Sequence, residues 1–237
     1  MKGVRLIFCT IAILMVMTGV TEVGSGGDKT ISKIATTDKV VALTIDDGPH
    51  NRVTPEILTI LREKQVKATF FVLGENVNKN PKILAQEVAD GHEIGIHTYS
   101  HPTLTNLSAK KIVEEFEKAE KAILPIAAKP TLFRPPGGLY NSQVLEIARQ
   151  RGYKAILWSI DTRDWSCPPK NKIIEVVFRE IKPGSIILMH DGQYPIPTPQ
   201  VMREIIDGLR ERGYDFVTVS ELLQYNKVWS INNLFSN

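Results

Sequence analysis

Segments with the pattern of buried strands alternate with segments of helical pattern along most of this chain. Strands are predicted at residues 40–45, 68–73, 93–96, 131–134, 154–160, 184–190 and 216–219. Helices are predicted at residues 54–64, 81–89, 108–124, 142–151, 172–181 and 199–212. This order is typical of parallel strands joined by helical crossovers. About seven such units in 237 residues predict a single-domain α/β fold, a distorted (β/α) barrel, with an open doubly wound sheet as the alternative.

The residues before the first predicted strand have a different composition. Lys2 and Arg5 precede an apolar stretch from Leu6 to Val20, and the polar segment "TEVGSGGDKT" follows. This is the order of a signal peptide, so we interpret residues 1–24 as a signal peptide or an N-terminal membrane anchor and expect an exported protein. We assign the remaining regions as a linker over 25–38, a folded domain over 39–225 and a C-terminal tail over 226–237.

The sequence argues against a nucleic-acid partner, a nucleotide ligand and a disulfide within the domain. The net charge is +3 and no basic run is present, which argues against a nucleic-acid partner. No glycine-rich phosphate loop follows the first strand, so a nucleotide is not expected. Cys167 is the only cysteine beyond the leader, and therefore no disulfide can form within the domain.

Side chains suited to catalysis or metal binding follow the predicted strands. They are Asp46 and Asp47 after the first strand, His97 after the third, Arg134 after the fourth, Asp161 and Asp164 after the fifth, and His190 after the sixth. The carboxyl ends of the strands of a parallel barrel lie on one face, where active sites are built. We therefore predict a single site on this face. Since neighbouring strand residues point to opposite sides, the two adjacent acids either are solvated turn formers or have separate partners.

Two histidines four residues apart, His97 and His101 in "HTYSH", predict a metal site. With one carboxylate from another strand end they form a set of three protein ligands, and the remaining coordination positions stay open for hydrolytic chemistry. Zinc fits these ligands, and cobalt, nickel or iron can be accommodated by the same set. Two solvated loop histidines are the alternative interpretation.

Two further residues are candidates for roles beside this metal. His190, which ends an apolar strand, is either a satisfied core residue or a general acid. Arg134 in "FRPPGG" is either a surface charge or the partner of an ionised Asp, whose pKa it would then lower.

The motifs "TIDDGP", "HTYSH", "FRPPGG", "DTRDW" and "LMH" occur here in the order found in polysaccharide deacetylases, carbohydrate esterase family 4. The chain resembles this family from about Val40 to Leu223. The resemblance implies a distorted (β/α) barrel and metal-dependent removal of acetyl groups from sugars, most often from N-acetylglucosamine units.

The resemblance also implies roles for individual residues. Asp46 is the general base, Arg134 orients it, Asp47 binds the metal with His97 and His101, His190 is the general acid, and Asp164 orients that histidine. Trp165 helps to wall the site. Gly137 stands where the family usually has an aromatic residue, commonly Tyr, and its backbone N–H remains a candidate donor to the oxyanion. We also assign Tyr194 to the lining of the sugar groove.

We therefore expect an N-deacetylase that acts on peptidoglycan or chitin-type oligomers and releases acetate. The alternatives are O-deacetylation of acetylated xylan and a catalytically silent exported glycan-binding module. We expect a monomer that contacts a membrane only through an uncleaved N-terminal segment. The resemblance and the export signal together indicate a bacterial envelope protein, secreted or attached to the outer face of the cytoplasmic membrane.

Overall fold

The computed structural model of the protein describes residues 30–234, so the predicted leader over residues 1–24 lies outside the described residues. Its eight strands form one sheet in which every pair is parallel. The strands are β1 (Val40–Asp46), β2 (Thr69–Val72), β3 (Glu93–Ile96), β4 (Leu132–Phe133), β5 (Lys154–Ala155), β6 (Ile160–Asp161), β7 (Ile186–His190) and β8 (Asp215–Val217). Their order is β5-β4-β3-β2-β1-β7-β6, and β8 also pairs with β1. The expected distorted barrel of parallel strands is confirmed.

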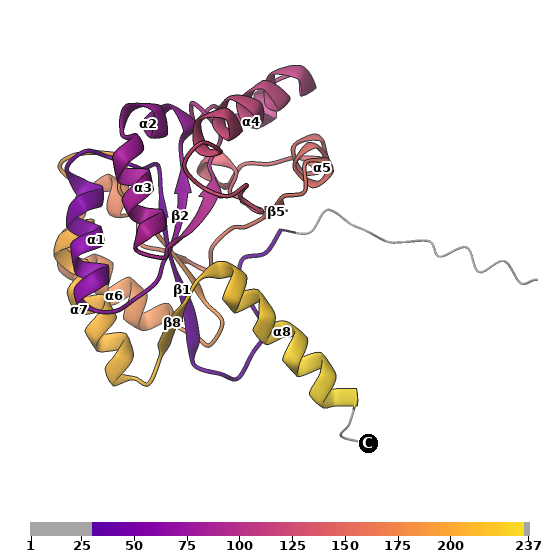
Figure 1. The fold of residues 1–237 in the computed structure, drawn as a ribbon. Coiled ribbons are helices and arrows are strands. Elements are labelled where there is room, and N and C mark those ends of the chain that lie inside the picture. The colour runs from indigo at the N-terminus through magenta and orange to yellow at the C-terminus, as the bar shows by residue number, and fades with distance from the viewer. Residues whose placement is uncertain (1–29, 235–237) are drawn as a thin grey trace, which may run out of the picture.

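Helices connect the strands and cover the sheet (Figure 1). They are α1 (Val53–Glu63), α2 (Gly74–Lys79), α3 (Pro81–Ala89), α4 (Ala109–Ile123), α5 (Ser142–Gln150), α6 (Lys170–Glu180), α7 (Thr198–Glu211) and α8 (Val219–Leu234). Figure 1 shows α1, α3, α6 and α7 together on one side of the strands, and the larger apolar cluster of the core includes residues of these helices and the strands. Among the described residues, no helix is both long and apolar enough to span a membrane.

Strand β1 lies between β2 and β7 in the sheet, and its sequence VVALTID is buried at every position. A strand covered on both faces has no polar side and reads as a continuous apolar run. The register places Asp46 beside Phe71 of β2 and beside His190 of β7. This pairing brings the carboxyl end of β1 next to that of β7, where the predicted base and acid lie.

The strand predicted over residues 154–160 is two strands at opposite edges of the sheet. β5 pairs with β4, whereas β6 pairs with β7, so the chain crosses the open side of the barrel between them. Residues of the expected linker lie at this crossing: Ile31 N donates to Ala155 O (2.9 Å), and Leu157 N donates to Ile31 O (2.7 Å). Periodicity does not reveal the break because the sequence from Ala155 to Trp158 is a continuous apolar run.

Two helices were not predicted from the sequence. The short helix α2 begins two residues after the end of β2. Its sequence GENVNK has one apolar side chain, Val77, and so shows no apolar period. Helix α8 extends to Leu234, so much of the segment assigned as a C-terminal tail is helical.

Candidate active site

A cavity of about 370 Å³ lies at the carboxyl ends of the strands. Of the residues to which the sequence analysis gives a role in the site, seven line it: Asp46, Asp47, His97, His101, Gly137, Trp165 and His190. Trp158, Asp161, Leu188 and Gln193 complete the lining. Arg134 and Asp164 are fully buried and contact the site from behind. The chain therefore brings residues from distant motifs to one place, as parallel strands of a barrel require.

Asp47, His97 and His101 form a group whose possible ligand atoms all lie within 4.8 Å of one another. Asp47 Oδ1 is 3.5 Å from His97 Nε2 and 3.6 Å from His101 Nε2. Two ligand atoms bonded to one tetrahedral zinc ion lie about 3.4 Å apart, from bond lengths of about 2.0–2.1 Å. The spacing of the three side chains therefore suits one shared ion.

The donor atoms themselves fit a metal ion. Asp47 Oδ1 is a buried oxygen without a hydrogen-bond partner among the described residues, although it faces both imidazoles. His97 Nδ1 lies 2.7 Å from the carbonyl oxygen of Arg134, which only accepts, so this nitrogen carries the proton and Nε2 is left with a free lone pair. Burial lowers the pKa of His97 to about 3, which keeps its imidazole neutral, as a ligand must be.

The backbone carries strain at the loops that present these ligands. Asp47 has φ 78°, Thr98 has φ 71° and His101 has φ 60°, all in the left-handed region that residues with a Cβ rarely adopt. Such strain persists only where the surroundings hold the backbone in place, and it is found most often at functional sites. The loop after β3 is held by Glu115 of α4, whose carboxylate accepts hydrogen bonds from the backbone N–H groups of Tyr99 and Ser100.

Asp46 is paired with Arg134 inside the protein. Arg134 Nη1 donates to Asp46 Oδ1 at 2.7 Å and to Thr44 Oγ1 at 2.8 Å. We expected the guanidinium to lower the pKa of the carboxyl group. Complete burial of Asp46 outweighs the arginine, and the net pKa is raised above its ordinary value. A raised pKa makes the carboxylate a better proton acceptor.

His190 is held by Asp164 in a similar way. Its Nδ1 donates to Asp164 Oδ1 at 2.7 Å, and its backbone N donates to Oδ2 at 2.8 Å. Thr198 Oγ1 and the backbone N of Trp165 also donate to this carboxylate. Burial alone would lower the pKa of His190, but the hydrogen bond and charge of Asp164 raise it to about 9. The imidazole is therefore protonated at neutral pH, and its second ring nitrogen remains available for proton transfer.

Asp191 is a buried acid of this region that the sequence motifs did not single out. Its carboxylate accepts a hydrogen bond of 2.5 Å from Thr54 Oγ1, which in turn accepts one of 2.7 Å from His50 N. The carboxylate also packs on the backbone of Gly48, where a Cβ would come within 2.4 Å of Oδ2. Asp191 thus supports the loop that carries Asp47. The signal was present in "LMHDG", a second acid directly after an apolar strand.

Of the three residues predicted to contact the substrate, Gly137 and Trp165 line the cavity and Tyr194 does not. Gly137 has φ 60° and lines the wall, and Trp165 is 53% exposed at the rim. Tyr194 is not part of the lining; its ring lies 5.0 Å from the guanidinium of Arg52. Trp158, which was not predicted as a site residue, forms a wall instead. Its ring packs so closely on Gly138 that a Cβ there would lie 2.8 Å from it.

Comparisons with known proteins identify the family of this chain. Residues 33–156 match the model of a family described as polysaccharide deacetylase. A peptidoglycan-N-acetylglucosamine deacetylase of Bacillus cereus is 39% identical over 196 residues, which cover 81% of this chain and 92% of the relative. A chitooligosaccharide deacetylase of Sinorhizobium fredii is 34% identical over 78% of this chain and 93% of its own length.

Solved structures show the same fold. The crystal structure of a CE4 family pseudoenzyme from Bacillus anthracis has a TM-score of 0.78 and 34% identity, and the match covers 83% of this chain and 69% of that one. A pseudoenzyme with this fold means that activity has to be argued from the site residues. The matched family model and the relatives of nearly equal length show that this chain belongs to the polysaccharide deacetylase family.

Proposed function

We propose that the protein is a metal-dependent N-deacetylase of the bacterial envelope that hydrolyses the acetamide of N-acetylglucosamine units in peptidoglycan and releases acetate. One observation carries this proposal. A three-residue group able to hold a metal, a buried carboxylate and a protonated histidine all line one cavity. Together these groups can supply what amide hydrolysis needs, because the carbonyl has to be polarised, water has to lose a proton, and the amine has to gain one before it leaves.

Asp47, His97 and His101 would hold the divalent ion, with zinc as the first candidate. When bound there, the ion polarises the acetyl carbonyl and lowers the pKa of a coordinated water. Three protein ligands leave positions free for water and substrate, whereas structural zinc sites are usually closed by four.

The chain's own groups move the protons. Asp46 accepts a proton from the attacking water through Oδ2, because Oδ1 is occupied by Arg134 and Oδ2 lies 3.7 Å from His97 Nε2 on the metal side. His190 donates its proton to the departing nitrogen, and Asp164 keeps the ring oriented and charged. The backbone N–H of Gly137 donates to the oxyanion.

Acetate release is the measurement that tests the proposal. The full-length protein should release acetate from peptidoglycan and from N-acetylglucosamine oligomers, a chelator should abolish the release, and zinc or cobalt should restore it. Asp46→Asn removes the base but keeps the ligands, and is the matched inactive control. Acetate release from acetylated xylan alone would overturn the N-deacetylase assignment and support O-deacetylation.

We also propose that the protein is exported through its N-terminal segment. The basic residues, the apolar stretch from Leu6 to Val20 and the polar segment that follows support this. Cell fractionation combined with N-terminal sequencing of the mature protein tests it. A cleaved N-terminus in the medium indicates secretion, an intact one in the membrane fraction indicates an anchor, and an intact protein in the cytosol contradicts export.

A further inference from the structure

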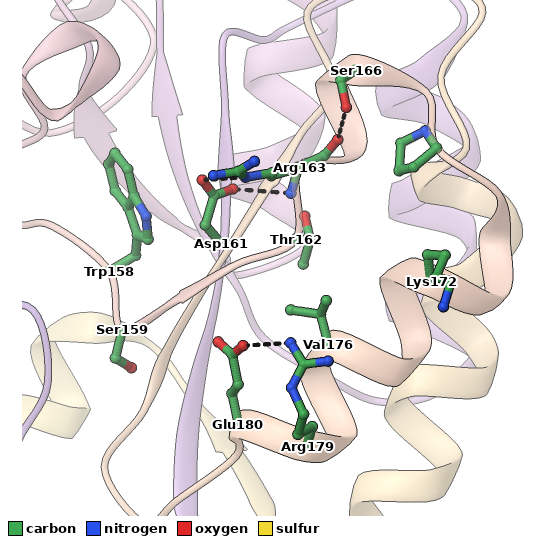
Figure 2. A pocket seen from close by; sticks show the side chains of 11 residues that line it. Trp158, Ser159, Asp161, Thr162, Arg163, Ser166, Lys172, Val176, Arg179 and Glu180 are labelled. Atoms are coloured by element: carbon green, nitrogen blue, oxygen red, sulfur yellow. Dashed lines mark hydrogen bonds and ion pairs between the residues drawn. The ribbon is translucent and has the colours of Figure 1, made fainter.

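A second cavity, larger than the catalytic one, lies beside it between residues 158–166 and helix α6. Its volume is about 590 Å³, compared with about 370 Å³ for the catalytic cavity. Figure 2 shows Trp158 and Asp161 on one side of it, and Val176, Arg179 and Glu180 of α6 on another. Volumes of this size are typical of ligand sites in proteins.

The two cavities share a wall. Trp158 and Asp161 line both of them. Trp158 is fixed in place, because its ring packs on Gly138 and lies 5.6 Å from the guanidinium of Arg134. A molecule that lies in the catalytic cavity and extends over these two residues therefore enters the second cavity.

The charges of the second cavity are paired. Arg163 Nε lies 4.0 Å from Asp161 Oδ2, Arg179 Nη2 donates to Glu180 Oε1 at 2.8 Å, and the ammonium of Lys172 is 2.9 Å from Glu175. Figure 2 shows the first two pairs at the edges of the cavity. With each cation matched by a carboxylate, the site has no surplus positive charge for a phosphate or another strong anion.

Paired charged groups still offer hydrogen bonds to a neutral ligand. A guanidinium has five N–H donors and a carboxylate about four lone-pair positions, so one ion pair leaves several of each unused. Beside them stands the partly exposed indole of Trp158, an apolar and rigid surface. Planar polar groups together with an aromatic face suit a saccharide, which has hydroxyl groups at its edges and C–H groups on the faces of its rings.

We infer that this second cavity is a saccharide subsite that binds a sugar unit of the glycan next to the unit being deacetylated. The inference rests on the proposed function, since only a polymeric glycan needs to occupy both cavities at once. Trp158 and Asp161 contact the glycan where it passes between the cavities. Arg179 and Glu180 hydrogen-bond the neighbouring sugar unit, and Val176 forms the apolar floor beneath it.

Substrate length tests this inference. Val176→Trp places an indole in the second cavity, far from the catalytic groups, and Asn171→Trp on the same helix is the matched control because Asn171 is exposed and does not line the cavity. With full-length protein, Val176→Trp should lower kcat/KM for the hexasaccharide of N-acetylglucosamine about tenfold, a change of about 1.4 kcal/mol. It should leave kcat/KM for the single sugar N-acetylglucosamine, which has no neighbouring unit to place in the second cavity, within about twofold, and Asn171→Trp should change neither.

A second variant covers the case in which the added indole disturbs folding. Arg179→Ala removes an exposed donor from the cavity and should reduce the preference for the hexasaccharide in the same direction, with an unchanged melting temperature. Equal kcat/KM ratios for the long and short substrates in all variants would overturn the inference, as would equal losses on both.

A binding measurement separates this inference from the proposed function. Calorimetric titration of the hexasaccharide into the Asp46→Asn protein, with and without Val176→Trp, reports binding without turnover. Weaker binding in the double variant supports the subsite even if no acetate is released from any glycan. Unchanged binding, together with acetate release by the native protein, overturns the subsite and leaves the proposed function standing.

Discussion

Arg134 Nη1 and Asp46 Oδ1 are 2.7 Å apart, and both side chains are buried. Removing the arginine by Arg134→Met leaves a buried carboxylate without its cation, which should destabilise the fold by about 3–5 kcal/mol. Arg134→Lys keeps a charge but loses the planar group that reaches Asp46, Thr44 and two backbone carbonyl oxygens together, so we expect a smaller loss of stability with reduced kcat. Urea unfolding and steady-state kinetics measure both. Full activity in Arg134→Lys would show that orientation of Asp46 is unimportant.

The His190–Asp164 pair predicts the alkaline limit of activity. A general acid with a pKa of about 9 is charged below that pH and loses its proton as the pH rises through it, so kcat/KM should fall above about pH 9. Asp164→Asn removes the charge that raises the pKa, and the alkaline limb should therefore move to lower pH. A pH profile of kcat/KM for both proteins decides this, and an unmoved limb would assign it to another group.

His97 predicts the dependence on metal. His97→Ala removes one of the three proposed ligands, and under the proposed function we expect the variant to lose bound zinc and acetate release together. His92→Gln is a suitable control, because His92 is also buried but its Nδ1 accepts from Ala68 N away from the site. Metal content by atomic spectroscopy is the primary readout. Undiminished activity of His97→Ala would remove this histidine from the ligand set.

Asp191 predicts an indirect contribution to metal binding. In Asp191→Ala the hydroxyl of Thr54 loses its acceptor and the loop of Asp47 loses its support, so zinc affinity should fall about 10–100-fold. Asp191→Asn keeps an oxygen that can accept from Thr54 and should recover most of the affinity. The absorption spectrum of the cobalt-loaded protein reports the geometry of the ligands, and an unchanged spectrum and affinity in Asp191→Ala would contradict this role.

Alanine substitutions at Gly137 and Gly152 should have similar effects on stability but different effects on activity. Gly137 and Gly152 both have positive φ, and a methyl group added at either would meet no atom closer than 3.9 Å, so alanine at each position should cost about 1 kcal/mol of backbone strain alone. Only Gly137 lines the catalytic cavity. Gly137→Ala should therefore lower kcat/KM, whereas Gly152→Ala should lower only the melting temperature. Equal kcat/KM in the two variants would show that the wall at Gly137 does not touch the substrate.

The sequence predicts the site better than some of the elements around it. The carboxyl ends of strands can be predicted from the sequence, because an apolar run that stops at Asp46 or His190 indicates both a buried strand and the polar residue that ends it. The alternation of strands and helices also predicts the barrel. The role of Glu115 in holding the loop after β3 cannot be predicted from the sequence. A glutamate on an amphipathic helix fits the same pattern whether it faces solvent or accepts hydrogen bonds from two backbone N–H groups.

The pKa of Asp46 shows a second limit of sequence reasoning. A motif can indicate that Arg134 pairs with an acid, and this pairing lowers the pKa. The size of the desolvation that opposes it depends on how completely the surrounding fold buries the carboxyl group. Burial of that kind is a property of the whole fold, which local spacing does not encode.

The segment that crosses between β5 and β6 is linked through Arg134 to the carboxylate of Asp46. Besides Asp46, the guanidinium of Arg134 donates to the carbonyl oxygens of Ile156 (3.3 Å) and Leu157 (3.0 Å), both on the segment that bridges the open side. The side chain of Arg134 therefore holds the segment that crosses the open side of the barrel and also fixes the position of the Asp46 carboxylate. A substitution that shifts this crossing segment also shifts the partner of Asp46, the proposed base. Substitutions in the crossing, which has no chemical role of its own, are therefore expected to be tolerated no better than substitutions in the catalytic cavity.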